Sequence, residues 1–250
     1  MKISNGVEML EIQIDSFGNP AMINPTLIWD DDTTILIDTG TPGSLEQIRI
    51  AMNEIGIPLN RLKVIILTHQ DIDHIGTLPD LIHEKGVEIE VYAHEADKPY
   101  IEGTLPLLKL NAESMAWQME AIPDEVRRSF LEELTNNRPK AKVTQTLVDN
   151  QELPYCGGIR VISTPGHTPG HISLYFQESK TLVAGDAVFS VDGVLYGPHP
   201  ESTPDMQTAL HSLEKFLYFD IDTMICYHGG VSRHNVNKQL KELVARRTSS

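Results

Sequence analysis

The chain has 250 residues, of which 40% are hydrophobic, so it is long enough to bury a large core. Its formal net charge of -15 argues against binding nucleic acid, because a nucleic-acid surface needs many basic side chains. The N-terminus has no apolar signal core, and no apolar run approaches bilayer length. We therefore expect a cytoplasmic protein with one domain over residues 1–250, no membrane contact, and reduced thiols at Cys156 and Cys226.

The first predicted elements are strands. Residues 10–14 alternate apolar and polar side chains, which is the period of a half-buried strand, and residues 26–29 predict a second strand. The apolar run 34–37 predicts a third strand, which ends at Asp38. The Asp38 carboxylate either orients a metal ligand or forms a turn, and the residues alone leave both interpretations open. A capping box beginning at Ser44 then predicts a helix.

The loop after the apolar strand 64–67 is rich in potential metal ligands. Within six residues it carries His69, Asp71, Asp73 and His74. Imidazole and carboxylate groups at this density are what zinc, iron or manganese ions require. Gly76 then allows the chain to turn into a helix predicted over residues 77–84, so the order is strand, ligand loop, helix.

A predicted strand over residues 87–94 ends at His94, which either approaches the metal ligands or lies at the surface. Residues 95–143 differ from their surroundings, because apolar side chains such as Met115 and Trp117 are spaced as in helices and no strand pattern is present. This helical insertion is either a lid over a binding site or a part of the core.

The second half of the chain returns to strands, predicted at residues 145–148, 158–163, 171–176, 181–184 and 223–226. Two Xaa-Pro-Gly-His units make up the loop Thr164–His171, whose prolines and glycines favour a rigid platform for ligands. Another carboxylate, Asp186, follows the strand 181–184, and His228 follows the strand 223–226. Helices are predicted from Thr203 and around Val236.

Four strand ends therefore carry potential ligands, and they include His69, His167, Asp186 and His228. Five of the ten histidines belong to these segments. Histidines distributed by chance would be spread along the chain, so we infer that the four strand ends meet in one metal centre.

In these segments the sequence resembles the metallo-β-lactamase superfamily, and the resemblance covers nearly the whole chain. The matching segments are Ile37–Gly40, His69–His74, Thr164–His171, Gly185–Ala187 and His228–Gly229. The resemblance implies a four-layer αββα sandwich with a metal pair at one edge. The branch with lactonases and glyoxalase II-like thioester hydrolases is the most similar, since a helical insertion there precedes the His-Thr-Pro-Gly-His loop.

The resemblance also implies a ligand set of His69 and His167 for the first ion, Asp73, His74 and His228 for the second, and Asp186 as the bridge. His171 takes a supporting position. The chain reads HxDxDH where most of the superfamily reads HxHxDH, so Asp71 stands in place of a histidine. We expect two divalent ions per chain, and Zn²⁺ is the leading candidate for both. A third carboxylate at Asp71 would favour the harder Mn²⁺ or Fe²⁺.

These features predict a hydrolase in which a metal-bridging hydroxide cleaves an ester, lactone, thioester or amide bond of a small molecule, with Asp73 orienting the nucleophile and transferring a proton. Three alternatives remain: a mononuclear iron enzyme like persulfide dioxygenases, a phosphodiesterase, and a non-catalytic metal-binding protein.

In the loop 188–202, the side chains of Phe189, Tyr196 and His199 either line a substrate pocket or are exposed. Both a monomer and a homodimer are compatible with the sequence.

Overall fold

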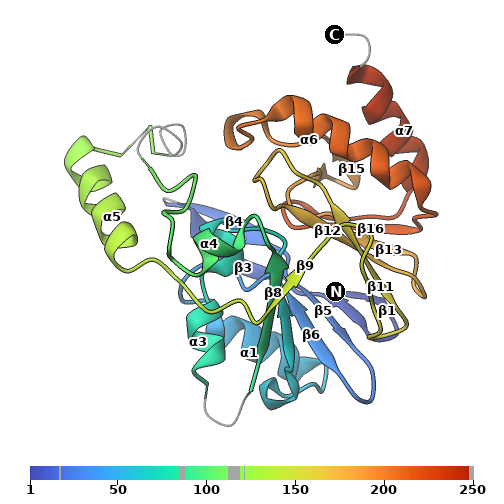
Figure 1. Ribbon diagram of the computed structural model, residues 1–250, viewed down its shortest axis with the longest axis horizontal. Coiled ribbons are helices and arrows are strands. Elements are labelled where there is room, and N and C mark those ends of the chain that lie inside the picture. The colour runs from blue at the N-terminus through green and yellow to red at the C-terminus, as the bar shows by residue number, and fades with distance from the viewer. Residues whose placement is uncertain (17, 85–87, 112–118, 121, 248–250) are drawn as a thin grey trace.

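A computed structural model of the chain describes residues 1–16, 18–84, 88–111, 119–120 and 122–247. Two sheets form its centre (Figure 1). The first sheet has the strand order β1 (Lys2–Ser4), β2 (Val7–Met9), β5 (Thr26–Trp29), β6 (Thr34–Ile37), β7 (Val64–Ile66), β8 (Glu90–His94) and β9 (Gln145–Leu147). The second has the order β10 (Glu152–Leu153), β11 (Ile159–Ser163), β12 (Ile172–Phe176), β13 (Thr181–Val183), β16 (Thr223–Cys226) and β17 (Gly230–Ser232).

Two hairpins and several helices complete the described fold. The hairpins are β3 (Ile12–Ser16) with β4 (Asn19–Ile23), and β14 (Phe189–Val191) with β15 (Val194–Tyr196). The helices are α1 (Leu45–Glu54), α2 (Ile72–Ile75), α3 (Leu78–Ile82), α4 (Lys98–Ile101), α5 (Asp124–Asn136), α6 (Met206–Ser212) and α7 (Val236–Arg247). Short 3₁₀ turns are η1 (Leu59–Arg61), η2 (Pro200–Ser202) and η3 (Leu213–Tyr218).

The period of two along the strands decides which side chains lie between the sheets. In β6, Ile35 and Ile37 face the second sheet, where they belong to one cluster with Leu174 of β12. Leu36 points to the opposite face and packs in a cluster with Ile48 of α1. Successive strand residues alternate between faces, so each central strand can contribute to two apolar layers.

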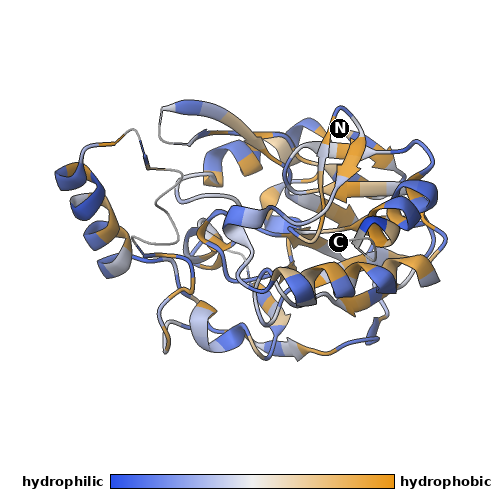
Figure 2. Cartoon of the chain, turned by 90° about the horizontal axis from the view of Figure 1, so that it is seen from above, coloured by the Kyte–Doolittle hydropathy of each residue, from blue (hydrophilic) through white to orange (hydrophobic). Residues whose placement is uncertain are grey.

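The outer face of the second sheet is covered in the same way. Leu182 of β13 and Met224 of β16 share a buried cluster with Phe216 of η3 and Leu240 of α7. Helices therefore cover both sheets, and the four-layer αββα architecture is confirmed. Figure 2 shows the resulting pattern, with hydrophobic residues gathered along the strands and hydrophilic ones on the outward sides of the helices.

Strand direction brings the ligand-bearing loops to one edge. The strands β6, β7, β8 and β9 are parallel neighbours, and Ile37, Ile66 and Tyr92 are in register across three of them. In the second sheet β13 and β16 are also parallel, with Val183 opposite Ile225. Parallel strands end at the same edge of a sheet, so the segments that follow β7, β13 and β16 leave on the same side of their sheets.

The helical insertion lies at one end of the molecule. Its helix α5 buries none of its side chains against the described residues, and it stands apart from the sheets in Figures 1 and 2. The apolar residues of α5 therefore do not join the main core, whereas Ile101, Leu107, Ala141 and Val143 of the same insertion do. Of the residues used to predict the insertion and the strand before it, Met115, Trp117 and Val87 lie outside the described residues.

The helix predicted from Ser44 starts as expected but lacks its side-chain cap, whereas the helix predicted from Thr203 starts later than expected. Ser44 precedes α1, but its hydroxyl lies 3.1 Å from the Thr41 hydroxyl and makes no capping bond to the helix. α6 begins at Met206, later than Thr203, and Asp205 caps it by accepting a hydrogen bond from the Thr208 N–H at 3.0 Å. The Ser44 hydroxyl is therefore taken up by a polar neighbour, and the Asp205 cap determines where α6 starts.

Two predicted ranges also change. The helix expected over residues 77–84 is the shorter α3, and α2 precedes it with Asp73 and His74 inside the helical turn. Residues 188–202 contain the hairpin of β14 and β15, because aromatic and β-branched residues pair across its two strands.

Among the residues that the structure describes, we find no helix long and apolar enough to span a membrane.

The two cysteines are free thiols, and we expect both to react slowly. Burial and the neighbouring Asp30 raise the pKa of Cys156 to about 12, so only about one thiol in 10⁴ is ionised at pH 8. Cys226 is fully buried. Labelling with a chromogenic disulfide at pH 8 should be slow in the native protein and complete after denaturation. Rapid labelling of native Cys156 would contradict this prediction.

Candidate metal centre

The predicted ligands lie together in two neighbouring groups. Each group offers ligand atoms that all lie within 4.8 Å of one another. The first group consists of His69, Asp71, His167 and Asp186, and the second of Asp73, His74 and His228. The loop after β7 contributes to both groups, and the loops after β11, β13 and β16 supply the remaining members.

Asp186 faces both groups. Its Oδ1 lies 3.2 Å from Nε2 of His74, and its Oδ2 lies 3.3 Å from Nε2 of His167 and 3.5 Å from Nε2 of His228. Asp73 Oδ2 lies 3.2 Å from Nε2 of His228. The Asp186 carboxylate therefore faces members of both groups, and it would be available to a metal ion held by either one.

Asp38 and Thr68 determine how two of the imidazoles are oriented. Asp38 Oδ2 accepts a hydrogen bond from Nδ1 of His74 at 2.9 Å and another from the Thr68 hydroxyl at 2.8 Å. Because the Thr68 hydroxyl donates its proton to Asp38, its oxygen accepts from Nδ1 of His69 at 3.0 Å. Both imidazoles therefore donate from Nδ1, and this hydrogen bond turns Nε2 toward the neighbouring ligands.

Three ligand atoms have no hydrogen-bond partner within the described part of the chain. They are Nε2 of His69, Nε2 of His74 and Oδ1 of Asp186, and all three are buried. A buried polar atom without a partner is costly, and it points to an ion or a water that satisfies it. Imidazole nitrogens held in the correct tautomer by a second hydrogen bond are also typical of metal ligands. The residues therefore fit divalent metal ions.

Asp38 itself has a left-handed backbone with φ 60°, an uncommon conformation for an aspartate. Its side chain is 1% exposed and also accepts a hydrogen bond from the Thr68 N–H at 2.8 Å. These contacts place Asp38 beneath His74, where it orients the imidazole. Backbone strain of this kind persists only where surrounding contacts hold it.

The chain carries the sequence pattern of a known family along most of its length. A family model described as "Metallo-beta-lactamase superfamily" matches residues 18–228. The chain belongs to the metallo-β-lactamase superfamily. This membership confirms the family resemblance seen in the ligand segments.

Among superfamily relatives, "Probable metallo-hydrolase YflN" of Bacillus subtilis (strain 168) is 30% identical over 86% of this chain and 83% of its own length. "Hydroxyacylglutathione hydrolase GloC" of Haemophilus influenzae is 30% identical over 66% of each chain. Among solved structures, a metallo-β-lactamase family protein from Thermus thermophilus has a TM-score of 0.72 at 23% identity, covering 99% of this chain and 81% of that one. The family relationship supports hydrolase activity.

The supporting histidine predicted from the superfamily pattern lies behind the ligands. Nε2 of His171 accepts a hydrogen bond from the Asp186 N–H at 2.9 Å, and its Nδ1 donates to the Thr164 hydroxyl at 2.8 Å. Both ring nitrogens are therefore used within the protein. His171 positions Asp186 through its backbone and has no free nitrogen for a metal.

Asp71 takes its place in the first group although it is not a histidine. Its Oδ2 lies 3.2 Å from Nε2 of His69 and 3.0 Å from Nε2 of His167. Lys109 Nζ forms a short ion pair with the same oxygen. Burial opposes the charge on Asp71, but Lys109, His69 and His167 hold the pKa of its carboxyl well below the usual range.

The carboxylates make this metallo-β-lactamase site strongly attractive to cations. Burial alone would lower the pKa of His74, but Asp186, Asp38 and Asp73 together raise it well above its ordinary value. Burial alone would lower the pKa of His228, but the neighbouring carboxylates of Asp186 and Asp73 raise it to about 10. Protons and metal ions compete for such ligands, so metal binding here releases protons.

The remaining candidates lie outside the two groups. His94 accepts a hydrogen bond from the Ala96 N–H at 3.2 Å and is not a member of either group. The Phe189 ring stacks on Tyr196 with centroids 5.2 Å apart and lies 5.9 Å from the His199 ring. The Ser190 N–H donates to the His228 carbonyl at 3.2 Å, so this aromatic cluster belongs to a hairpin joined to a ligand-bearing segment.

Asp97, which was not predicted as a site residue, joins the two main ligand loops. Its fully buried carboxylate accepts from the Gln70 N–H at 3.0 Å, the Thr168 hydroxyl at 2.7 Å and the Gly170 N–H at 2.7 Å. A Cβ on Gly170 would lie 2.6 Å from Asp97 N, so only glycine allows this approach. Asp97 showed no local signal, because its partners are remote in sequence.

Lys109 was not predicted either. Its only sequence signal is a single lysine within the apolar stretch 107–110. A lysine at such a position has many surface explanations, and only the folded chain shows that its ammonium meets Asp71 and His167.

Proposed function

We propose that this chain is a hydrolase that uses two divalent ions to cleave an ester, lactone, thioester or amide bond in a small molecule. The observation that carries this proposal is the set of buried ligand atoms without a hydrogen-bond partner on His69, His74 and Asp186, which belong to the two ligand groups. Divalent ions held there would polarise a carbonyl oxygen and activate water for attack on the carbonyl carbon.

The side chains have separable roles in this proposal. The first ion would be held by His69, Asp71 and His167, the second by Asp73, His74 and His228, with Asp186 between them. Asp73 is the carboxylate best placed for proton transfer, because its side chain is 26% exposed, against 15% for Asp71 and 11% for Asp186. It can orient water on one side and deliver a proton to a leaving group on the other.

The substrate class is inferred from the surroundings of the second group. The His228 side chain is 42% exposed, so a substrate can reach this group from solvent. The aromatic cluster of Phe189, Tyr196 and His199 lies on the adjoining hairpin segment and offers apolar contact. One relative is named a hydrolase of hydroxyacylglutathione. These observations favour an acyl compound with an apolar part, and they support including thioesters among the test substrates.

Metal content and hydrolysis test the proposal together. We expect two equivalents of a divalent ion per chain after reconstitution, measured by elemental mass spectrometry. Zn²⁺ is the leading candidate, and Mn²⁺ or Fe²⁺ are the alternatives that Asp71 favours. A panel of lactones, thioesters and esters should show hydrolysis that a chelator abolishes and added metal restores. One tightly held iron without hydrolysis would favour the oxygenase alternative. No metal after reconstitution would refute the proposal.

Removing the metal should also destabilise the fold. A ligand that binds only the native state at 100 times its dissociation constant adds about 2.7 kcal/mol to the free energy of unfolding. The partly buried carboxylates of Asp71, Asp73 and Asp186 belong to the two neighbouring ligand groups. When the ions leave, the repulsion between these carboxylates is no longer neutralised and lowers the stability of the fold. Chemical denaturation with and without chelator measures this difference. Equal unfolding free energies under both conditions would contradict the prediction.

A further inference from the structure

The first ligand group already contains a positive charge from the chain itself. Lys109 Nζ lies 2.5 Å from Nε2 of His167 and 3.1 Å from the Ser202 carbonyl oxygen, and it forms an ion pair with Asp71 Oδ2. The Lys109 side chain is only 13% exposed. An ammonium has three donors, and three acceptors surround this one, so it is fully partnered inside the group.

The ammonium and a metal ion would need the same atoms. Nε2 of His167 has a single lone pair, which either accepts from Lys109 or binds a metal. Asp71 Oδ2 is likewise shared, since it faces Lys109, His69 and His167. The second group differs, because no lysine or arginine forms an ion pair with Asp73 in the described chain. Lys109 therefore competes with a metal ion in the first ligand group and does not compete in the second.

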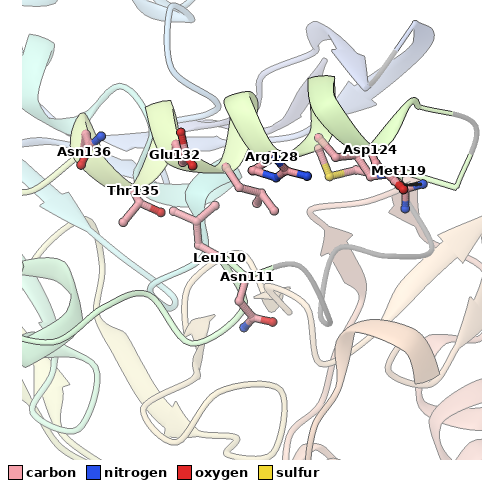
Figure 3. Close-up of a pocket in the computed structure, with 10 residues that line it drawn as sticks. Leu110, Asn111, Met119, Asp124, Arg128, Glu132, Thr135 and Asn136 are labelled. Carbon is pink, nitrogen blue, oxygen red and sulfur yellow. Dashed lines mark ion pairs between the residues drawn. The ribbon is translucent and has the colours of Figure 1, made fainter.

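Two hollows border the segment that carries Lys109. This segment follows the buried Leu107 and is held to the ligand loop by the Leu108 N–H, which donates to Oε1 of Gln70 at 2.9 Å. Beyond this anchor, a hollow of about 590 Å³ lies under α5 and another of about 380 Å³ lies along residues 105–111. Figure 3 shows Leu110 and Asn111 on one side of the larger hollow, opposite Arg128 and Glu132 of α5.

We propose that the Lys109 ammonium exchanges with the divalent ion of the first group, so that this group fills last and its filling expels Lys109. The inference rests on the proposed function and specifies the order in which the site is loaded. Asp71 is the residue that makes the exchange favourable, because a carboxylate binds an ammonium as well as a metal, whereas a neutral imidazole has no negative charge to pair with lysine. Lys109 thus controls when the first ligand group can take up its metal ion, and it does so without contacting the substrate.

Calorimetric titration of the chelator-stripped full chain with Zn²⁺ alone tests the exchange. The wild type should bind one equivalent tightly and a second more weakly. Lys109→Met keeps the aliphatic stem and removes the competing charge, so it should tighten the second equivalent about tenfold or more. The first equivalent should change by less than about threefold. The matched control Lys142→Met removes an exposed lysine of the same insertion and should leave both affinities unchanged.

A second measurement uses the unmutated protein. Brief acetylation followed by peptide mass spectrometry should label Lys109 more extensively after the second Zn²⁺ equivalent than after the first. Unchanged labelling, or an unchanged second affinity in Lys109→Met, would overturn the exchange and leave the hydrolase proposal standing. Failure of both proteins to bind Zn²⁺ would overturn the hydrolase proposal itself, so the two failures are distinguishable.

Discussion

Replacing Asp73 by alanine should lower kcat/KM by about 10²–10⁴-fold, the range expected when a positioned proton-transfer group is removed. Asp73 Oδ2 faces Nε2 of His228 at 3.2 Å and is partly open to solvent. The fold should survive, because the α2 turn keeps its backbone hydrogen bonds, including His74 N–H to the Asp71 carbonyl at 2.9 Å. Hydrolysis of the preferred substrate in the panel and circular dichroism measure the two effects.

The matched control for this change is Asp80→Ala, which removes an exposed carboxylate from the adjacent α3. It should leave hydrolysis unchanged. Metal content of the Asp73→Ala protein then separates two roles, since loss of one ion indicates a ligand and full retention indicates a proton-transfer group only. Hydrolysis at the wild-type rate in a metal-loaded Asp73→Ala protein would refute both roles.

Replacing Asp97 by alanine should reduce the free energy of unfolding by about 3–6 kcal/mol. The substitution leaves the Gln70 and Gly170 N–H groups and the Thr168 hydroxyl without their acceptor, and each buried unsatisfied group costs about 1–3 kcal/mol. Asp97→Asn should be less damaging, because the amide oxygen can still accept. Urea denaturation of the metal-stripped proteins measures the loss without a contribution from metal binding.

Metal affinity should fall together with stability in Asp97→Ala, because the carboxylate ties the loop of His69 to the loop of His167. Asp124→Ala is a suitable control, since Asp124 is 85% exposed and pairs with Arg127 at the surface. Its cost should stay below about 1 kcal/mol. A similar unfolding free energy for wild type and Asp97→Ala would show that the two loops do not depend on this carboxylate.

The layers of the fold could be predicted from sequence because they follow from local periodicity. The strand predicted over residues 26–29 has those bounds as β5, and the strand predicted over residues 223–226 has them as β16. Alternating side chains and short apolar runs specify such strands without reference to the rest of the chain. Side-chain caps were less predictable, as at Ser44, because a cap depends on which polar neighbour competes for the side chain.

Residue types and their order were enough to indicate which side chains can bind a metal, because imidazole and carboxylate groups at strand ends are visible in the sequence. How these side chains are held became clear only in the folded chain. Asp97 meets Gly170 from 73 positions away, and Asp71 meets His167 from 96 positions away. The proton positions on His69 and His74 depend on Thr68 and Asp38, and the placement of Lys109 depends on the path of the insertion. The physical reason is that residue type specifies which bonds a side chain can make, whereas long-range packing specifies its partners.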